Sequence, residues 1–189
     1  RTPQGVARAN LPGPETGEIG MKIELPGWRV NYTQPVVGPH NTIYLTPYEE
    51  GLFAYNFEGE FLWQLLSDSL KTIEQSGFCT PLIDSEGTIY SLAYTSSNTT
   101  KIFSVNREGE ILWTSKVTGR HTSNLNIDRE GNLLFCTGDG FLHSVCSIDG
   151  RENWKTQGSG GYECTTTLRT FPISPDGGVI YLAGNKGGG

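Results

Sequence analysis

The sequence has no apolar run near the roughly 18 residues that a membrane-spanning helix needs, and no basic start leading into an apolar stretch like a signal peptide. Its 14 Lys and Arg residues are scattered among 20 Asp and Glu residues, which gives a net charge of −6. No basic patch is therefore available for the phosphates of nucleic acid or for anionic lipids. These absences argue against a nucleic-acid partner and against a membrane span.

Arrangements of residues that carry out chemistry are also missing. No two of the four cysteines are adjacent, and none has the C-x-x-C spacing of a zinc or redox site. There is no Gly-x-Ser-x-Gly nucleophile elbow and no phosphate-binding glycine loop. A zinc site from Cys136, His143 and Cys146 is disfavoured, because His143 and Cys146 point to opposite faces of one expected strand. We expect no catalytic, cofactor-binding or metal-binding residue.

The cysteines allow three disulfide pairings, and buried or unpaired thiols are the simpler interpretation. A bridge between Cys136 and Cys146 is disfavoured, because folding their hairpin about Asp139 places Cys136 opposite Leu142. Asn31 and Asn98 each begin an N-glycosylation sequon, but a chain of this composition contains about two such triplets by chance. The four cysteines are Cys79, Cys136, Cys146 and Cys164.

The composition favours short strands joined by glycine turns. The chain of 189 residues contains 25 Gly, 11% aromatic residues, 18% charged residues and a single Met. Few stretches have the periodicity of a helix, whereas aromatic and β-branched runs bounded by turn residues are frequent. We therefore expect an all-β protein, and its length suffices for one domain with a sizeable core.

One pattern recurs along the chain: a strand, a tight turn that contains glycine, and a second strand. In three copies the glycine comes four residues before a tryptophan. A weaker fourth copy, Glu15 to Met21, places Gly17 in the turn and Met21 in the tryptophan position. The three repeat pairs are Gly59 with Trp63, Gly109 with Trp113, and Gly150 with Trp154.

A second landmark, an aromatic residue that closes an apolar strand, gives the same period. The aromatic residues are spaced by 46, 45 and 46 residues. Four short antiparallel strands with a period in the forties are typical of a β-propeller blade. Because a lone four-stranded sheet leaves both faces unburied, blades pack face to face, and the repeated tryptophans are expected between neighbouring blades. The landmark residues are Tyr44, Tyr90, Phe135 and Tyr181, preceded by Pro35, Pro81, Asn126 and Pro172.

Each expected unit combines a Gly-x-Ile-Tyr strand, a strand ending in Ala, and Gly-Glu-x-x-Trp, as in Gly87 to Tyr90, Ala93 and Gly109 to Trp113. This pattern resembles the repeat of the pyrroloquinoline-quinone-like, or quinoprotein-alcohol-dehydrogenase-like, β-propellers, over nearly the whole chain. The resemblance implies a propeller but no single function, because quinone-dependent dehydrogenases, an outer-membrane assembly lipoprotein and many binding modules share it. A dehydrogenase of this kind would be expected to have adjacent cysteines, which this sequence lacks.

The repeat register divides one propeller domain, residues 1–189, into whole and half blades. We letter the four strands of a blade A to D in chain order. Strands C and D of one blade are expected at 5–23, whole blades at 35–65, 80–115 and 124–156, and strands A and B of a last blade at 171–184. Three arrangements remain open: part of a larger ring, a closed four-bladed ring in which the half blades join, or a half ring completed by a second copy.

Recognition is expected on the face where the B–C turns and the connections from strand D to the next strand A emerge. The segment from Tyr90 to Ser104 is longer than its counterparts, and we assign the excess to a polar B–C turn around 95–100. The long connections 65–80 and 155–171 share this face. We expect a non-catalytic scaffold that binds a protein partner there, without a cofactor.

Two alternatives remain. One is a fragment of a quinone-dependent dehydrogenase whose cofactor ligands lie in other blades. The other is a carbohydrate- or polymer-binding module, for which Tyr48, Phe78 and Tyr162 are the candidate aromatic residues. The family resemblance and the even number of cysteines favour an extracytoplasmic compartment, periplasmic or secreted, over the cytosol, but they do not decide it.

Overall fold

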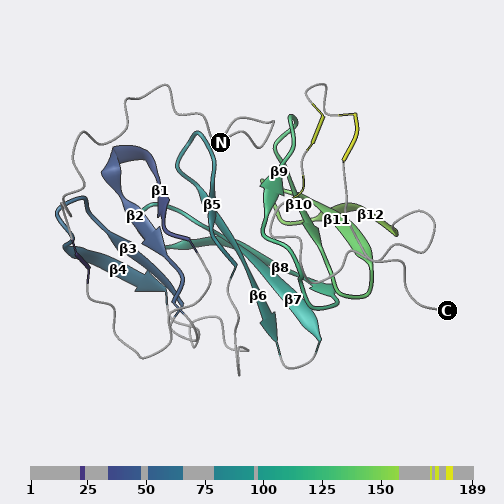
Figure 1. Cartoon of the computed structure of the whole chain (residues 1–189), viewed down its shortest axis with the longest axis horizontal. Coiled ribbons are helices and arrows are strands. Elements are labelled where there is room, and N and C mark those ends of the chain that lie inside the picture. The colour runs from purple at the N-terminus through teal and green to yellow at the C-terminus, as the bar shows by residue number, and fades with distance from the viewer. Residues whose placement is uncertain are drawn as a thin grey trace.

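Three four-stranded antiparallel sheets lie side by side in the computed structural model (Figure 1). The structure describes residues 22–23, 34–47, 51–65, 79–95, 98–157, 171, 173–174 and 178–180. Within these residues the strands follow one another in simple up-and-down order in every sheet. The predicted all-β fold of four-stranded antiparallel blades is confirmed, and we call the three sheets blades one, two and three.

The blades share one plan: a first strand of two residues leads into longer central and outer strands. Blade one contains β1 (Val36–Val37), a short 3-10 helix η1 (Pro39–Asn41), β2 (Ile43–Leu45), β3 (Leu52–Tyr55) and β4 (Phe61–Leu65). Blade two contains β5 (Leu82–Ile83), β6 (Ile89–Thr95), β7 (Thr99–Val105) and β8 (Ile111–Thr118). Blade three contains β9 (Asn126–Ile127), β10 (Asn132–Cys136), β11 (Phe141–Cys146) and β12 (Glu152–Gln157).

The turns between the first two strands of blades two and three are built by aspartate and glycine. The Asp84 carboxylate accepts hydrogen bonds from the amides of Glu86 and Thr88, both at 2.9 Å. In blade three the Asp128 carboxylate likewise accepts hydrogen bonds from the amides of Glu130 and Asn132. The glycines that end the two turns, Gly87 and Gly131, adopt φ angles of +88° and +83°. These contacts are local in sequence, so the Asp-x-x-Gly pattern suffices to specify the turn.

The hairpin between the third and fourth strands carries a register shift at the same place in every blade. The shift follows Ala54 in β3, Ser104 in β7 and Ser144 in β11. Each of these small residues pairs with the repeat tryptophan of the neighbouring outer strand: Trp63, Trp113 or Trp154. The three tryptophans therefore hold equivalent positions within their own sheets.

The core lies between blades, because alternate residues of each strand point to opposite faces. One cluster joins blades one and two, and a second joins blades two and three. The fully buried side chains in these two layers include Leu52, Ile89, Phe103, Leu92, Ile102, Leu133 and Phe135.

Both ends of the row of blades carry further packed residues. Beyond blade three, Ile173 pairs with Ile180 in an antiparallel bridge, and both pack with Phe171 against Leu134, Cys136 and Leu142. Before blade one, Ile23 packs against Ile43, Phe53 and Tyr55. Side chains from outside the three sheets thus cover part of the outer face at each end of the row.

The extra length of blade two differs from the sequence expectation. We assigned it to a turn around 95–100, but β6 and β7 continue their pairing to Thr95 and Thr99. The outer strand β8 extends with them and pairs Thr118 with Thr99. The excess is therefore a three-stranded extension of the sheet, because threonine pairs well in a ladder once a third strand is present.

No helix among the described residues is long and apolar enough to cross a membrane.

Candidate recognition site

Trp63 forms the contact between blade one and the outer hairpin of blade two. Its indole Nε1 donates a 2.7 Å hydrogen bond to the carbonyl of Arg107, and its ring lies on Gly109. A β-carbon added at Gly109 would lie 2.8 Å from Cδ2 of Trp63, closer than real carbon contacts. Tyr44 packs on the same indole at a ring distance of 5.9 Å. The glycine is thus needed both for its φ of +88° and for the space it leaves.

Trp113 repeats this contact between blades two and three. Its Nε1 donates a 2.9 Å hydrogen bond to the carbonyl of Ser147, and a β-carbon at Gly150 would lie 2.5 Å from its Cε3. Tyr90 takes the place of Tyr44, with a ring distance of 6.2 Å. In both contacts the acceptor carbonyl belongs to the first residue of the hairpin loop. We call this arrangement of indole, loop carbonyl and glycine the tryptophan contact.

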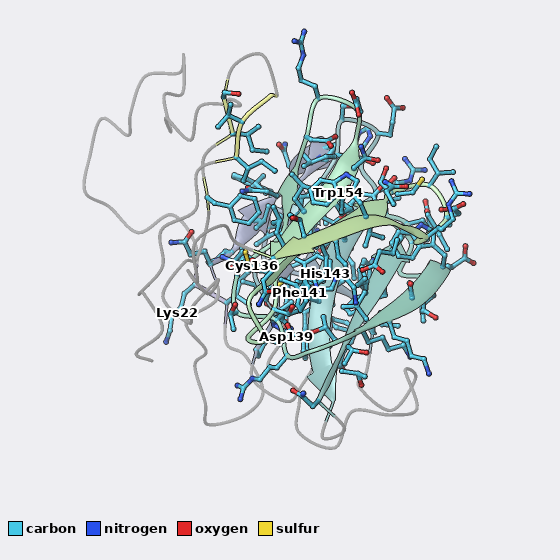
Figure 2. All side chains as sticks on the ribbon, turned by 90° about the vertical axis from the view of Figure 1, so that its right-hand side faces the viewer. Lys22, Cys136, Asp139, Phe141, His143 and Trp154 are labelled. Carbon is cyan, nitrogen blue, oxygen red and sulfur yellow. The ribbon has the colours of Figure 1, made fainter. Side chains whose placement is uncertain are left out.

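Trp154 is the exception. It lies on β12, where every residue is exposed, and its own side chain is 43% exposed. Its indole has neither a hydrogen-bond partner nor an aromatic partner among the described residues. Figure 2 looks onto this end of the row, with Trp154, His143 and Phe141 all on blade three. The third tryptophan therefore has the position of the first two within its sheet, but no hairpin of the described residues covers it as those of blades two and three cover Trp63 and Trp113.

The face that carries the B–C turns is continuous across blades two and three. The amide of Gly119 donates to the carbonyl of Asn98, and the amide of Gly138 donates to the carbonyl of Arg120, both at 2.8 Å. The buried Thr100 hydroxyl donates to the Gly119 carbonyl at 2.7 Å and accepts from the His121 amide at 2.7 Å. The connection after β8 is thereby fixed between the extended hairpin of blade two and the β10–β11 turn.

The exposed side chains on this face are polar and of both charges. They include Asn98 in the extended hairpin, Arg120 in the connection and Asp139 in the β10–β11 turn. Asn98 adopts a φ of +54°, in the left-handed region that asparagine tolerates better than most residues. We call the surface formed by residues 98–100, 118–122 and 137–140 the loop face.

His121 belongs to the connection that forms part of the loop face, and its imidazole is strongly affected by burial. Desolvation, together with the nearby positive charge of Arg120, lowers the pKa of His121 to about 4. Its backbone pairs with Thr137 in an isolated antiparallel bridge. A neutral imidazole at this position keeps an uncompensated charge out of the core at neutral pH.

A buried polar network also supports the loop face. Oγ1 of Thr137 lies 2.9 Å from Nε2 of His143, whose Nδ1 lies 2.7 Å from Glu152. The Thr137 hydroxyl donates to Asp139 at 2.5 Å. A hydroxyl, an imidazole and a carboxylate in this order resemble a hydrolase triad, but a nucleophile must reach its substrate. Thr137 and His143 are 0% and 2% exposed, so the network positions the turn.

Sequence analysis missed both Thr100 and this network. The alternation of β11 does point His143 inward, and that was the available signal. Nothing local reveals that Glu152 lies beside it, because β11 pairs with β12 only in the folded sheet.

The cysteines have different states. Cys136 is disulfide-bonded, whereas Cys79 and Cys146 are free. Cys136 pairs with Leu142 across the hairpin, so the expected absence of a bridge to Cys146 is confirmed. The simpler interpretation of unpaired thiols is wrong for Cys136. Burial raises the pKa of Cys79, which is therefore an inert thiol.

Other expected positions are partly outside the described residues. Asn98 is exposed, while Asn31 and the aromatic candidates Tyr48, Phe78 and Tyr162 lie outside the described part, as do most residues of the connections 65–80 and 155–171. Within the described part, no three His, Cys, Asp or Glu side chains are grouped as metal ligands.

Comparison with known proteins gives a fold and no established activity. No family model and no curated protein matches the sequence. The chain resembles a protein of unknown function from Bacteroides caccae at 15% identity and a TM-score of 0.56, over 76% of this chain and 49% of that one. It also resembles the computationally designed Ika4 protein at 11% identity and a TM-score of 0.51, over 88% of this chain and 100% of that one.

A further similar structure is BamB from Moraxella catarrhalis, at 18% identity and a TM-score of 0.49, covering 65% of this chain and 35% of that one. The chain thus spans about half the length of the Bacteroides caccae protein, from its 49% coverage. At these identities the likeness concerns the fold alone. The three four-stranded antiparallel sheets that lie side by side place the chain in the β-propeller class.

Proposed function

We propose that this β-propeller is a non-catalytic scaffold that binds a protein partner through its loop face. The observation that carries the proposal is the extension of β6, β7 and β8 together with the connection hydrogen-bonded beside it. A surface whose backbone is already fixed loses little conformational entropy on binding, which favours recognition. Loops on a rigid scaffold are where propeller-like folds commonly place recognition.

The chemistry of this surface fits a polar protein partner. Asn98 offers an amide, Arg120 a guanidinium and Asp139 a carboxylate, all exposed on one face. Mixed polar and charged groups of this kind give a protein interface its specificity and its register. We also propose that the chain belongs to the pyrroloquinoline-quinone-like propellers, because its Gly-Glu-x-x-Trp repeat resembles theirs.

The compartment that we propose is extracytoplasmic. Disulfides persist in oxidising compartments and are rare in the cytosol. The disulfide-bonded Cys136, in a chain that also keeps two free thiols, supports this assignment.

Site-specific photocrosslinking tests the proposed recognition face. A photoreactive phenylalanine analogue at Asn98 should crosslink to one discrete protein in the native source. The matched control is the same analogue at Glu130, which is exposed in the turn between β9 and β10 of blade three, at the end of the sheet opposite the B–C turns. Equal crosslinking at the two positions would contradict the proposal.

A second measurement tests the non-catalytic assignment. Titration with pyrroloquinoline quinone in the presence of calcium should show no tight binding, and no reduction of an electron-accepting dye should follow. Tight quinone binding with calcium-dependent dye reduction would instead establish the dehydrogenase alternative.

A further inference from the structure

The buried Thr137 hydroxyl at the loop face has more acceptors around it than one hydrogen can serve. Its Oγ1 lies 2.5 Å from Oδ1 of Asp139, 3.3 Å from the carbonyl of Phe141 and 2.9 Å from Nε2 of His143. A hydroxyl has one hydrogen to donate and two lone pairs that accept. The short contact with the carboxylate takes that hydrogen. The hydroxyl must therefore accept a hydrogen bond from Nε2 of His143.

The other ring nitrogen of His143 also faces a group that only accepts. Its Nδ1 lies 2.7 Å from Oε1 of Glu152, and an ionised carboxylate has no hydrogen to donate. Two carboxylates, one hydroxyl and one imidazole are thus joined by three hydrogen bonds, of which the hydroxyl supplies one hydrogen. The imidazole must supply the other two. His143 is therefore an imidazolium between Glu152 and, through Thr137, Asp139.

The surroundings of His143 combine an aromatic ring, apolar side chains and charges of both signs. Its ring stacks on Phe135 at a ring distance of 5.2 Å. Blade two packs on that side through Ile102 and Val117. The charged and titratable side chains on the surrounding elements are Glu152 and Lys155 of β12, Arg151 before it, Asp139 of the β10–β11 turn, Arg120 and His121 of the connection, and Lys101 and Lys116 of blade two.

Among these groups, the histidine in the network is the one suited to respond near neutral pH. Histidine is the side chain that ordinarily changes its charge between pH 5 and 8. The neighbouring His121 stays neutral over that range, because burial lowers its pKa to about 4. Lys101 and Lys116 pair with each other on the face of blade two opposite to Ile102.

Loss of one proton from the imidazolium leaves the network one hydrogen short. Glu152 contacts the ring directly, so Nδ1 keeps its hydrogen, and the bare Nε2 faces the hydroxyl oxygen at 2.9 Å. The Thr137 hydroxyl needs only to rotate about its C–O bond to donate to Nε2. Asp139 then faces an oxygen at 2.5 Å without a hydrogen between them, which two acceptors cannot sustain. Because Asp139 is exposed, its carboxylate can move into water.

The bound carboxylate of Asp139 also touches the connection on the loop face. A β-carbon added at Gly119 would lie 2.8 Å from Oδ1 of Asp139, so the carboxylate lies against this glycine. The backbone bond from Gly138 to Arg120 does not involve the network. Release of Asp139 therefore moves a negative charge on the loop face while the backbone beside it stays paired.

We propose that His143 is a proton-operated switch of the loop face: the imidazolium holds Asp139 on Thr137, and the neutral imidazole releases it. The switch is a property of the turn itself and does not rest on a partner at the loop face. It is therefore tested on the protein alone, and a failure of either proposal leaves the other standing.

NMR spectroscopy and crystallography of the full chain at about pH 5 and about pH 8 test the switch. Proton–nitrogen correlation spectra should show both ring nitrogens of His143 protonated at the acidic end and one at the alkaline end. Crystal structures should show Asp139 withdrawn from Thr137 only at the alkaline end, with Glu152 still beside Nδ1. A ring that keeps one protonation state throughout, or withdrawal of Glu152 instead, would overturn the proposal.

Glu152→Gln and Asp139→Asn supply the missing hydrogen from the protein. An amide donates as well as accepts, so in either variant all three hydrogen bonds form around a neutral imidazole. The backbone amide signals of the β10–β11 turn should shift with pH in the unmodified chain and no longer shift in either variant. The matched control, Glu130→Gln, changes an exposed carboxylate outside the network and should leave the shift intact. A shift that persists in both network variants would exclude this switch.

Discussion

Replacing Gly109 with alanine tests the tryptophan contact most directly. Gly109 has a φ of +88°, and an L-residue in this region costs about 1–2 kcal/mol. The added β-carbon would lie 2.8 Å from Cδ2 and 3.0 Å from Cε3 of Trp63, so the indole must move. Its displacement loses the hydrogen bond to Arg107, about 1 kcal/mol, and about 1–2 kcal/mol of apolar burial. We therefore expect Gly109→Ala to lower the free energy of unfolding by about 3–5 kcal/mol in total.

Gly131→Ala is the matched control. Gly131 has a φ of +83°, but a β-carbon there would meet only Ser147, at an ordinary 3.7 Å. Its cost should therefore be the backbone strain alone, about 1–2 kcal/mol. The difference of about 2–3 kcal/mol between the two variants measures the contact with Trp63.

Equilibrium unfolding in urea measures these free energies, provided that the dependence on urea concentration is unchanged among the variants. In a Trp63→Ala background, Gly109→Ala should cost only as much as Gly131→Ala, because the clash is gone. Equal costs for the two glycine variants in the wild-type background would refute the structural role assigned to Trp63.

Three further predictions follow from the described contacts. Alkylation of the denatured, unreduced chain should label two thiols, because Cys79 and Cys146 are free and Cys136 is disulfide-bonded. Reduction should raise the number of labels to four, since Cys164 is the one other cysteine of the sequence that could be the partner of Cys136. Four labels without reduction would contradict this prediction. The pKa of His121 is lowered to about 4 from 6.5, so the unfolded chain binds the extra proton and stability should fall as pH drops from about 6.5 to 4. His121→Gln should remove this part of the pH dependence measured by thermal unfolding, and an unchanged slope would exclude His121 as its source. Thr100→Val removes both the donor to Gly119 and the acceptor for His121 and should cost about 2–4 kcal/mol in urea unfolding, whereas Thr118→Val on the exposed end of β8 should cost less than about 0.5 kcal/mol.

The turns were predictable from the sequence because their contacts are local. The Asp84 carboxylate bonds amides two and four residues further along the chain. Glycines such as Gly87 are required by a positive φ that the neighbouring residues impose. Such features depend on a few consecutive residues, so a repeat of those residues reveals them.

The loop face was predicted only in outline. Its position followed from the up-and-down order of strands, but the hydrogen bonds that hold its backbone did not. The threonine-rich segment after Tyr94 looks like a turn in isolation and becomes a sheet extension because β8 runs beside β7 to Thr118. Likewise, the hydrogen bonds of Thr100 reach Gly119 and His121, which are about 20 residues away.

The sequence by itself determined the period, the four-stranded unit and the place of each repeat tryptophan within its sheet, because these depend on local alternation and turn chemistry. Only the tertiary structure decided what each tryptophan contacts. Trp113 and Trp154 follow their glycines at the same spacing, yet Trp113 rests on Gly150 while Trp154 is 43% exposed. Burial depends on what lies across the gap between sheets, and that neighbour is set by the assembly of distant segments.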